Sequence, residues 1–467
     1  MRKSRPGSSL SHGRAHAADH RVWSRRDFLS QLGAGGVAAS FMMGGKPMHA
    51  YGYHPLAAAL QAGDTDRVLV LIQLNGGNDG LNTIIPIEND TYYTLRPNIA
   101  IPKAEAVNLN ADFGMHPLLN PLESVWNDGK LGIVHGVGYP DPNLSHFRST
   151  DIWSTGSNSD EFLSTGWLGR HFDTENPDFQ ESPPDHPLAV QLGQASSLIL
   201  QGPLSPMGMN IASQNILERL ANGGQLYDEA AVPGNNHGDQ LAYVRTIAND
   251  SYHYAGVIHE ALGIGTNAVA YPEQNNLATD LASVARMIKG GLPTRLYLVS
   301  IGGFDTHANQ LTRHENLMDD LGRAMRAFQD DLTNSGHDEC VLTMTFSEFG
   351  RRVEENGSRG TDHGTAAPLF VMGKDVNGGF FGDAPSLETL DNKGNLVHST
   401  DFRSIYATVL ESWLGVGAVA VDDIFGQSFE RLDLVNGSGT GVSTETGAVT
   451  AFDLHQNYPN PFANQTT

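Results

Sequence analysis

Residues 67–82 read RVLVLIQLNGGNDGLN, and this stretch indicates the class of fold. Residues 68–74 form an almost unbroken apolar run, which is typical of a strand buried on both faces of a parallel sheet. The run ends in NGGNDG, and glycines after a strand allow a sharp turn and the close approach of a ligand. Asp79 is therefore expected at the carboxyl edge of the sheet, either as a metal ligand or as a turn residue that bonds its own loop.

Further apolar runs predict buried strands, and several amphipathic segments predict helices. The runs cover residues 131–137, 295–301, 340–346 and 369–372. The helical patterns cover residues 241–262, 276–289, 310–333 and 401–414. His314 lies near the start of one of these helices, where we expect it to be solvated. Residues 155–240 are poorly periodic and rich in Gly, Pro, Ser and Asn, which indicates an elaborated loop region.

The composition limits the partners of the chain. Its 467 residues include 29 Lys and Arg against 52 Asp and Glu, for a net charge of −23. Residues 1–50 hold eight basic and two acidic side chains, so the remainder carries 21 minus 50, or −29. So acidic a body argues against nucleic acid or an anionic membrane surface, and it is compatible with cation binding. Cys340 is the one cysteine, which excludes an intramolecular disulfide, and its apolar surroundings predict a buried, inert thiol.

Later segments carry side chains that suit a zinc-like ion. One strand ends in GGFDTH, which places Asp305 and His307 at a carboxyl edge like that of the opening stretch. Asp362 and His363 stand side by side in a glycine-flanked loop before the last strand, where metal binding suits them better than packing. Glu348 follows another strand, and we expect it to pair with an arginine rather than to bind metal.

The segment after residues 131–137 predicts a loop and then a helix that begins at Ser145 and runs through Trp153. Ser145 has two interpretations at that position. It is either an ordinary helix cap or a hydroxyl placed to attack an anion that the free backbone N–H groups of the helix would hold.

The amino terminus predicts export. Residues 24–29, SRRDFL, resemble the twin-arginine motif, and the apolar stretch at 29–45 is too short and too rich in glycine for a permanent membrane span. We therefore interpret residues 1–50 as a twin-arginine signal peptide, residues 51–435 as the folded domain and residues 436–451 as a linker.

The segments LNGGNDGLN, GGFDTHANQ, SEFGRR and TDHGTAAP, together with this leader, resemble the bacterial family called domain of unknown function 1501. The resemblance covers most of residues 20–430. This family is usually placed in the alkaline phosphatase-like superfamily, with sulfatases, phosphodiesterases and cofactor-independent phosphoglycerate mutases. The resemblance implies an α/β fold with a central, mostly parallel sheet and helices on both faces. It also implies one or two divalent ions (Zn, Ca, Mg or Mn) at the carboxyl edge of the sheet.

The same resemblance implies roles for individual residues. Asp79 matches the first-strand metal aspartate, and Asp362 and His363 match the Asp-His ligand pair. Asp305 and His307 resemble the other metal site. The superfamily commonly places three residues between that Asp and His, whereas a single threonine separates them here.

The resemblance also places a nucleophile near the predicted helix start. Ser145 stands roughly at that position, although Ser149 and Thr150 are close by. We expect His146 to be either a catalytic residue or a ligand. In the mechanism that we expect, Arg148 or the helix amino terminus would neutralise charge on the group that is attacked. The chain contains no C-x-P-x-R sulfatase sequence, which argues against formylglycine chemistry.

A second resemblance lies in residues 452–467. LHQNYPNPF resembles the opening of the sorting domain of type IX secretion substrates, which implies passage to the cell surface or medium. Such domains usually run on for tens of residues, so we interpret this stretch as the beginning of one. The expected partners are then the twin-arginine and type IX export machinery.

The leading hypothesis is an exported, metal-dependent hydrolase of phosphate or sulfate esters with a serine or threonine nucleophile. Its substrate would be a small anionic ester or a sulfated or phosphorylated polymer. The rival hypothesis is a catalytically inactive surface binding or assembly protein on the same fold.

Overall fold

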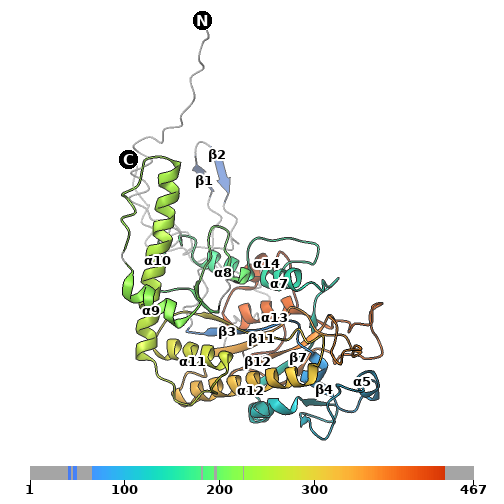
Figure 1. The fold of residues 1–467 in the computed structure, drawn as a ribbon. Helices are drawn as coiled ribbons and strands as arrows, with labels where there is room; N and C mark the ends of the chain where they lie inside the picture. The colour runs from blue at the N-terminus through green and yellow to red at the C-terminus, as the bar shows by residue number, and fades with distance from the viewer. Residues whose placement is uncertain are drawn as a thin grey trace, which may run out of the picture.

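A large mixed sheet forms the centre of the protein (Figure 1). The computed structural model describes residues 40–43, 46–49, 66–179, 182–193, 197–224 and 226–436. The nine strands follow the order β13-β7-β12-β11-β3-β10-β8-β9, with β14 paired to β7. Every pairing in this sheet is parallel except the two made by β12. The prediction of an α/β fold with a central, mostly parallel sheet is therefore confirmed.

The five predicted strands are all present near their predicted bounds. They are β3 (Val68–Asn75), β7 (Leu131–Gly138), β10 (Leu296–Gly302), β11 (Val341–Phe346) and β12 (Ala367–Met372). β3 lies in the middle of the sheet, and six of its eight residues are buried, as its apolar sequence requires. The flanking strands are short: β8 (Ala189–Leu192), β9 (Met209–Ile211), β13 (Gly379–Phe381) and β14 (Thr400–Asp401).

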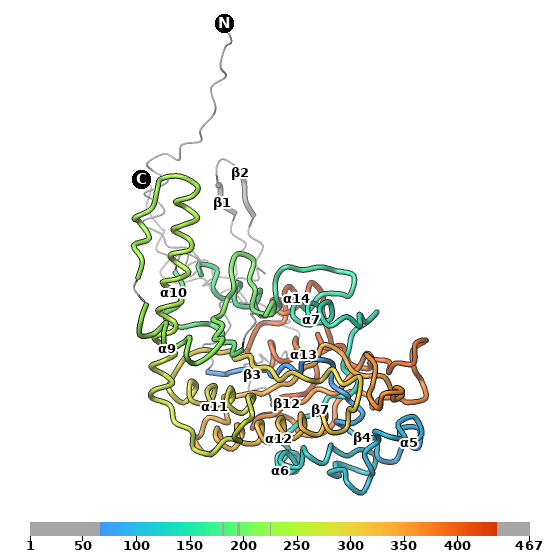
Figure 2. Tube along the Cα trace, viewed as in Figure 1, coloured from blue at the N-terminus to red at the C-terminus, as the bar shows by residue number. Residues whose placement is uncertain are grey.

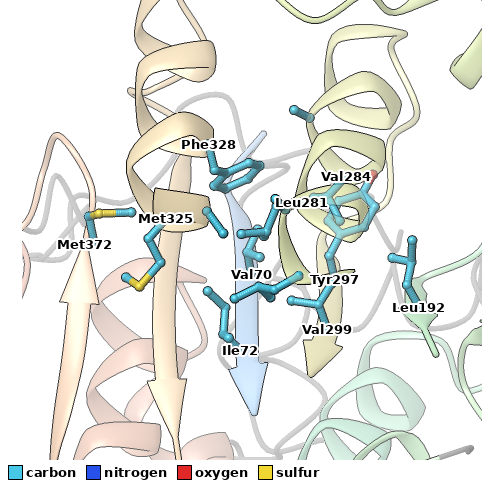
Figure 3. Packing of buried hydrophobic residues seen from close by; sticks show 14 of the residues in the cluster. Val70, Ile72, Leu192, Leu281, Val284, Tyr297, Val299, Met325, Phe328 and Met372 are labelled. Carbon is cyan, nitrogen blue, oxygen red and sulfur yellow. The ribbon is translucent and has the colours of Figure 1, made fainter. Parts of the chain in front are cut away.

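Helices cover both faces of the sheet, and each face has its own hydrophobic core. One core contains residues of α10 (Asn236–Ile264), α11 (Asn276–Lys289) and α12 (Gln310–Ser335), next to the shorter α9 (Gln214–Gly223). The other contains residues of α7 (His146–Thr155), α8 (Trp167–Glu175), α13 (Phe402–Thr408), the π-helical turn η3 (Val409–Trp413) and α14 (Ala418–Phe425). Figure 3 shows the first core, where Val70 and Val299 from the strands meet Leu281 and Phe328 from the helices.

A smaller region packs beside one end of the sheet. Figure 2 shows residues 80–127 running next to the loops that follow β11. A third apolar cluster joins the two segments through side chains such as Ile85, Tyr92, Val353 and Leu396. Its elements are α4 (Gly80–Thr83), β4 (Ile84–Pro86), α5 (Asp90–Leu95), β5 (Val107–Asn108), β6 (Phe113–Met115), η1 (Pro117–Leu122) and α6 (Glu123–Asn127).

Most of the two terminal segments lies outside the described residues. Of the predicted signal at 1–50, the structure describes the paired strands β1 (Ser40–Met43) and β2 (Lys46–His49), and the twin-arginine motif is not included. Residues 437–467, which contain the predicted linker and sorting segment, are outside it as well. Within the described part, no helix combines the length and the apolar character that crossing a bilayer requires.

A buried histidine makes the stability of this fold depend on pH. His135 in β7 stacks on Phe380, with ring centroids 4.6 Å apart, and burial lowers its pKa from 6.5 to about 4. Between these two values the unfolded chain binds more protons than the folded one. Stability should therefore fall as pH drops from 6.5 towards 4, by at most about 1.4 kcal/mol per pH unit from this group.

The variant His135→Phe should lose that part of the pH dependence, because its ring cannot be protonated. Urea unfolding of both proteins at pH 7 and pH 5 measures the difference. An equal loss of stability between the two pH values in both proteins would contradict the assignment.

Candidate metal centre

Loops from distant parts of the sequence meet at the carboxyl edge of the parallel strands. The loops after β3, β10 and β11 start at this edge, and so does the amino terminus of α7, which follows β7. β12 runs antiparallel to its neighbours. The loop before β12 therefore lies at the same edge. This explains why Asp362 and His363 lie there although they precede a strand in the sequence, whereas Asp305 and His307 follow one.

Glycine allows two of these loops to approach each other closely. Gly76 has a φ of +120°, and a Cβ atom at this position would lie 2.4 Å from the backbone nitrogen of Asp305. A side chain here would push the β3 and β10 loops apart. The sequence analysis expected these glycines to permit the close approach of a ligand; at Gly76 the close neighbour is the protein backbone, and the approach of a ligand stays a prediction.

Asp305 is at the centre of a cluster of three histidines. Its Oδ1 atom lies 3.0 Å from Nε2 of His307, 3.3 Å from Nε2 of His363 and 3.6 Å from Nε2 of His146. The Nε2 atoms of His307 and His363 are themselves 3.0 Å apart. The side chain of Asp305 is 49% exposed, so this cluster faces solvent and a ligand could reach it.

Each of the three imidazoles is held by an acceptor at its other nitrogen. Nδ1 of His146 lies 2.9 Å from Oε1 of Glu348, and Nδ1 of His307 lies 3.2 Å from Oδ1 of Asp362. Nδ1 of His363 donates to the carbonyl oxygen of Leu144 at 2.8 Å. Carboxylates and carbonyls in this position are the usual outer partners of histidines that bind metal, because they fix the ring tautomer and orientation.

These outer bonds determine what the three Nε2 atoms present to the cluster. Because carboxylate and carbonyl oxygens only accept hydrogen bonds, each Nδ1 carries a proton, and the neutral form of each ring then has its lone pair at Nε2. Three lone pairs then face one anionic oxygen at 3.0–3.6 Å. The guanidinium of Arg351 offsets part of the repulsion at that oxygen, and a bound cation would offset the repulsion among the three nitrogens. The donor set therefore fits a bound cation.

The distances from Asp305 to the three nitrogens are also close to those between neighbouring ligands of a tetrahedral site. Zinc–nitrogen bonds of about 2.0–2.1 Å in tetrahedral geometry place neighbouring ligand atoms about 3.3 Å apart. The distances from Asp305 Oδ1 to the three Nε2 atoms lie around this value. Three imidazoles and one carboxylate favour zinc or a similar transition metal over calcium or magnesium, which prefer all-oxygen sites.

A buried arginine keeps Asp305 ionised and fixes the loops around it. Nη2 of Arg351 donates to Asp305 Oδ1 at 2.6 Å, and the arginine side chain is fully buried. Burial acts to raise the pKa of Asp305, but the hydrogen bond and charge of Arg351 outweigh this effect, and the pKa falls to about 2. Arg351 also donates to the carbonyl oxygens of Gly77, Phe304 and Thr361, so one side chain joins three loops.

The expectation for Glu348 was wrong. It was predicted to pair with an arginine, but Arg351 pairs with Asp305 instead. Glu348 is buried, and its Oε1 accepts from His146 and from the backbone N–H of Gly76 at 2.8 Å. The physical reason is local geometry, because Glu348 points toward the amino terminus of α7. Its part in the site is to orient a histidine.

Asp79 does not join the cluster. It is 1% exposed, and both of its carboxylate oxygens accept from Nη1 of Arg96, at 2.9 and 2.7 Å. Gln310 donates to the same carboxylate. Burial acts to raise the pKa of Asp79, but Arg96 and its other partners lower it below its usual value.

Among the described residues, His146, Asp305 and His363 form a group whose ligand atoms all lie within 4.8 Å of one another, and His307 is beside this group, with its Nε2 atom 3.0 Å from both Asp305 Oδ1 and His363 Nε2. Asp79 is not part of that group, and the role as a metal ligand that the resemblance implied for it stays a prediction. Its carboxylate is engaged in a buried ion pair, and we leave it out of the proposed ligand set.

Asp79 instead supports the floor of the site. Gln310 joins the buried ion pair to the loops above it, because its Oε1 accepts from Thr306 at 3.0 Å and from Thr361 at 2.6 Å. His314, expected to be solvated, is 1% exposed, with Nε2 3.2 Å from Oδ1 of Asn78. That expectation was wrong because the first turns of α12 pack beneath the loop after β3.

The candidate nucleophile is next to the cluster in sequence. Ser145 occupies the N-cap position of α7 as predicted, but its side chain makes no capping hydrogen bond. It is exposed, and it directly precedes His146. Ser149 is fully buried, lies 2.8 Å from the Tyr139 hydroxyl and donates to the Glu348 carbonyl oxygen, so it is not free to attack a substrate.

Arg148 was expected to neutralise charge on the group that is attacked, but its side chain contacts a neighbouring loop instead. Its Nη2 donates to backbone carbonyl oxygens of the loop at residues 158–161, including that of Ser159 at 3.1 Å. Its guanidinium also lies 3.9 Å from the ring centroid of Phe162. These contacts tie Arg148 to that loop, and no contact with the histidine cluster is recorded among the described residues.

Several residues of the site escaped sequence reasoning. Arg351 and Glu348 lie in the quoted segment SEFGRR, but nothing in the sequence alone says which acid each would meet. Gln310 ends the quoted segment GGFDTHANQ, where no role was predicted for it, and Arg96 lies outside every quoted segment. A weak signal existed for Arg351, since a basic residue shortly after a buried strand, in a chain with so few cations, has to find acceptors.

Residues 223–414 match the family described as protein of unknown function (DUF1501). The matched range contains Asp305, His307, Asp362 and His363, whereas the segment with Ser145 and His146 precedes it. Among curated proteins, none matches this chain.

Similar solved structures include a sulfatase, PsFucS1, from Pseudoalteromonas sp. (12% identity, 82% of this chain and 76% of that chain covered, TM-score 0.37). A protein in the alkaline phosphatase superfamily from Vibrio parahaemolyticus is 10% identical (79% and 71% covered, TM-score 0.33). The C-terminal periplasmic domain of EcEptC from Escherichia coli, in complex with Zn, is 9% identical (67% and 75% covered, TM-score 0.31). At these identities and TM-scores the likeness carries no argument about function.

Proposed function

We propose that this protein is a metal-dependent hydrolase of phosphate or sulfate esters. The observation that carries the proposal is the convergence of three Nε2 atoms on Asp305 Oδ1, each ring held in the metal-binding tautomer by an outer acceptor. His146, Asp305, His307 and His363 would hold one zinc-like ion. Asp362 would act as the outer partner of His307, in place of the direct ligand that the resemblance implied.

When bound, the ion would polarise an ester oxygen and lower the pKa of a nearby nucleophile. The amino terminus of α7 would hold the remaining anionic oxygens through its free backbone N–H groups, since helix amino termini favour anions. His146 is the first residue of α7, so this anion-binding end and the metal cluster are adjacent. An ester that binds both would have its phosphorus or sulfur atom beside Ser145.

The reaction would then proceed in two steps. Ser145 Oγ would bond to phosphorus or sulfur while the bond to the leaving oxygen breaks, and the proton lost by the serine hydroxyl would pass to the leaving alcohol. Water would next cleave the seryl ester, which releases phosphate or sulfate and restores the serine hydroxyl. Both steps need only water as a co-reactant.

The remaining sequence predictions are consistent with this activity and are proposed with it. A twin-arginine leader and a type IX sorting segment would direct the protein to the periplasm, the cell surface or the medium. The substrate would be a small anionic ester or a sulfated or phosphorylated polymer. Because the body of the protein is strongly acidic, the cation and the helix terminus would have to supply the local attraction for such an anion.

Hydrolysis of p-nitrophenyl phosphate and p-nitrophenyl sulfate by the purified chain tests the proposal. We expect release of p-nitrophenol from at least one ester, its loss after treatment with a chelator and its return when zinc is added. Ser145→Ala should lower kcat by at least about 100-fold while it leaves zinc binding unchanged, because the nucleophile is lost and the ligands remain. The matched control is Ser159→Ala, on the exposed loop that Arg148 contacts.

Two outcomes would count against the proposal. Zinc binding without hydrolysis across a panel of phosphate and sulfate esters would instead favour a binding or assembly protein on this fold. Full activity in the Ser145→Ala variant would remove the serine from the mechanism and would leave water as the nucleophile.

A further inference from the structure

A cleft away from the metal centre has the composition of a small-molecule site. It lies beside the carboxyl ends of β8 and β9, between α9 and α11, and has a volume of about 350 Å³. Leu192, Ile211, Leu217 and Met287 are buried and form apolar walls. Figure 3 shows Leu192 at the margin of the core, beyond the helix that carries Leu281 and Val284. Pockets of this size, with apolar walls and a few polar groups, are typical ligand sites.

One acidic side chain lines this cleft without a partner. Asp280 is partly buried on α11, and no hydrogen bond or ion pair to its carboxylate is recorded among the described residues. Burial raises its pKa from 3.8 to about 6. A partly buried carboxylate that lines a cavity and has no cation or donor beside it is a candidate position for binding a ligand.

The contrast with Asp331, another acid of the same helical layer, makes the point clearer. Asp331 on α12 is fully buried, but it accepts from Lys289, Asn267, Tyr271 and the backbone of Ala268. Its pKa is lowered by these bonds despite its burial. The fold therefore compensates one carboxylate in this layer completely, and it leaves the one that faces the cleft without compensation.

We propose that this cleft binds a small organic cation, with its ammonium group at Asp280 and its hydrocarbon part against the apolar walls. The carboxylate would supply the charge partner and the apolar walls would supply hydrophobic contact. Thr279 directly precedes Asp280, and Ser283 follows it by three residues on the same helix; both line the cleft. Their hydroxyls donate to backbone carbonyl oxygens, so their oxygen atoms can accept N–H donors in the same site.

Charge complementarity selects a cation over the other small-molecule classes. An anion would meet the carboxylate of Asp280 in a strongly acidic protein, with no basic residue among the residues that line the cleft. A neutral apolar molecule would cover Asp280 and leave it unpaired and more deeply buried, which is costly. An amine with a hydrocarbon tail satisfies both the carboxylate and the walls.

The site is independent of the proposed hydrolase. None of the residues that line the cleft belongs to the cluster around Asp305 or to the loops that hold it. Removal of the ion from the metal centre should therefore leave binding in the cleft unchanged, and the two proposals can fail separately.

Isothermal titration calorimetry of the full chain at pH 7.5 tests the inference with three probes of equal chain length: hexylammonium, hexanol and hexanoate. We expect hexylammonium to bind at least 10-fold more tightly than hexanol, and hexanoate not to bind. Asp280→Asn should reduce the affinity for hexylammonium to that for hexanol. Glu260→Gln, which removes an exposed acid on α10, is the matched control and should bind as the wild type does.

The melting temperature shows whether the Asp280→Asn variant is folded. Because Asp280 has no partner to lose, Asp280→Asn should melt at the same temperature as the wild type or higher. Equal affinities for hexylammonium and hexanol in the wild type would overturn the inference. Unchanged binding of hexylammonium by a folded Asp280→Asn protein would also overturn it. The same holds if none of the three probes binds to the wild type.

Discussion

His363→Ala is expected to weaken zinc binding by at least about 100-fold. Loss of an outer partner of a metal ligand typically costs 10–100-fold in affinity, so loss of a direct ligand should cost more. The ring of His363 lies 3.3 Å from Asp305 and 3.0 Å from His307 through Nε2, so its removal opens one side of the cluster. Isothermal titration calorimetry, in which zinc is added to protein freed of metal by a chelator, measures the change in affinity.

The matched control is His253→Ala, which removes a histidine from α10 and leaves the site intact. Its Nε2 lies 3.0 Å from the carbonyl oxygen of Asp185, so it already has a partner elsewhere. The control should bind zinc as the wild type does. Equal zinc affinities of His363→Ala and the wild type would show that this ring is not a ligand.

Asp79→Asn is expected to destabilise the protein by about 3–5 kcal/mol and to leave zinc binding unchanged. The substitution leaves the buried guanidinium of Arg96 without its charge partner, and breaking a buried ion pair from one side has this cost. Arg96 and Asp79 both have side chains that are 0% exposed, so water cannot replace the lost contact. Urea unfolding measures the free energy, and zinc titration of the folded variant measures the site.

The double variant Asp79→Leu/Arg96→Met separates the ion pair from the packing around it. Replacement of both partners by apolar groups should recover much of the stability that the single variant loses, since neither charge is then left unpaired. A different result for Asp79→Asn would support the role of metal ligand that the resemblance implied for Asp79. In that case Asp79→Asn would be as stable as the wild type and would lose its zinc.

Much of the fold followed from apolar runs. The strand predictions were confirmed because each run is long, bounded by glycine or polar residues and buried on both faces of the sheet. The direction of β12 could not be predicted in this way, because a buried strand reads the same whether it runs parallel or antiparallel. Direction depends on the path of the loop at residues 347–366, whose position is set by contacts such as those of Arg351.

The candidate site was only partly predictable, for a related reason. Asp305, His307, Asp362 and His363 were visible because metal-binding residue types follow or precede strands at a glycine-rich edge. The distinction between Asp79 and Asp305 was not visible, since each is an aspartate after a strand and a pair of glycines. It depends on which arginine reaches which aspartate, and Arg96 arrives from a separate segment with no motif.

The metal centre itself is tested most directly by anomalous diffraction from crystals soaked in zinc. The arrangement of side chains predicts one strong peak that lies about 2.0–2.1 Å from Nε2 of His146, His307 and His363 and close to Asp305. A zinc peak beside Asp79 and away from these three rings would contradict the account, as would fully occupied soaking sites with none among them.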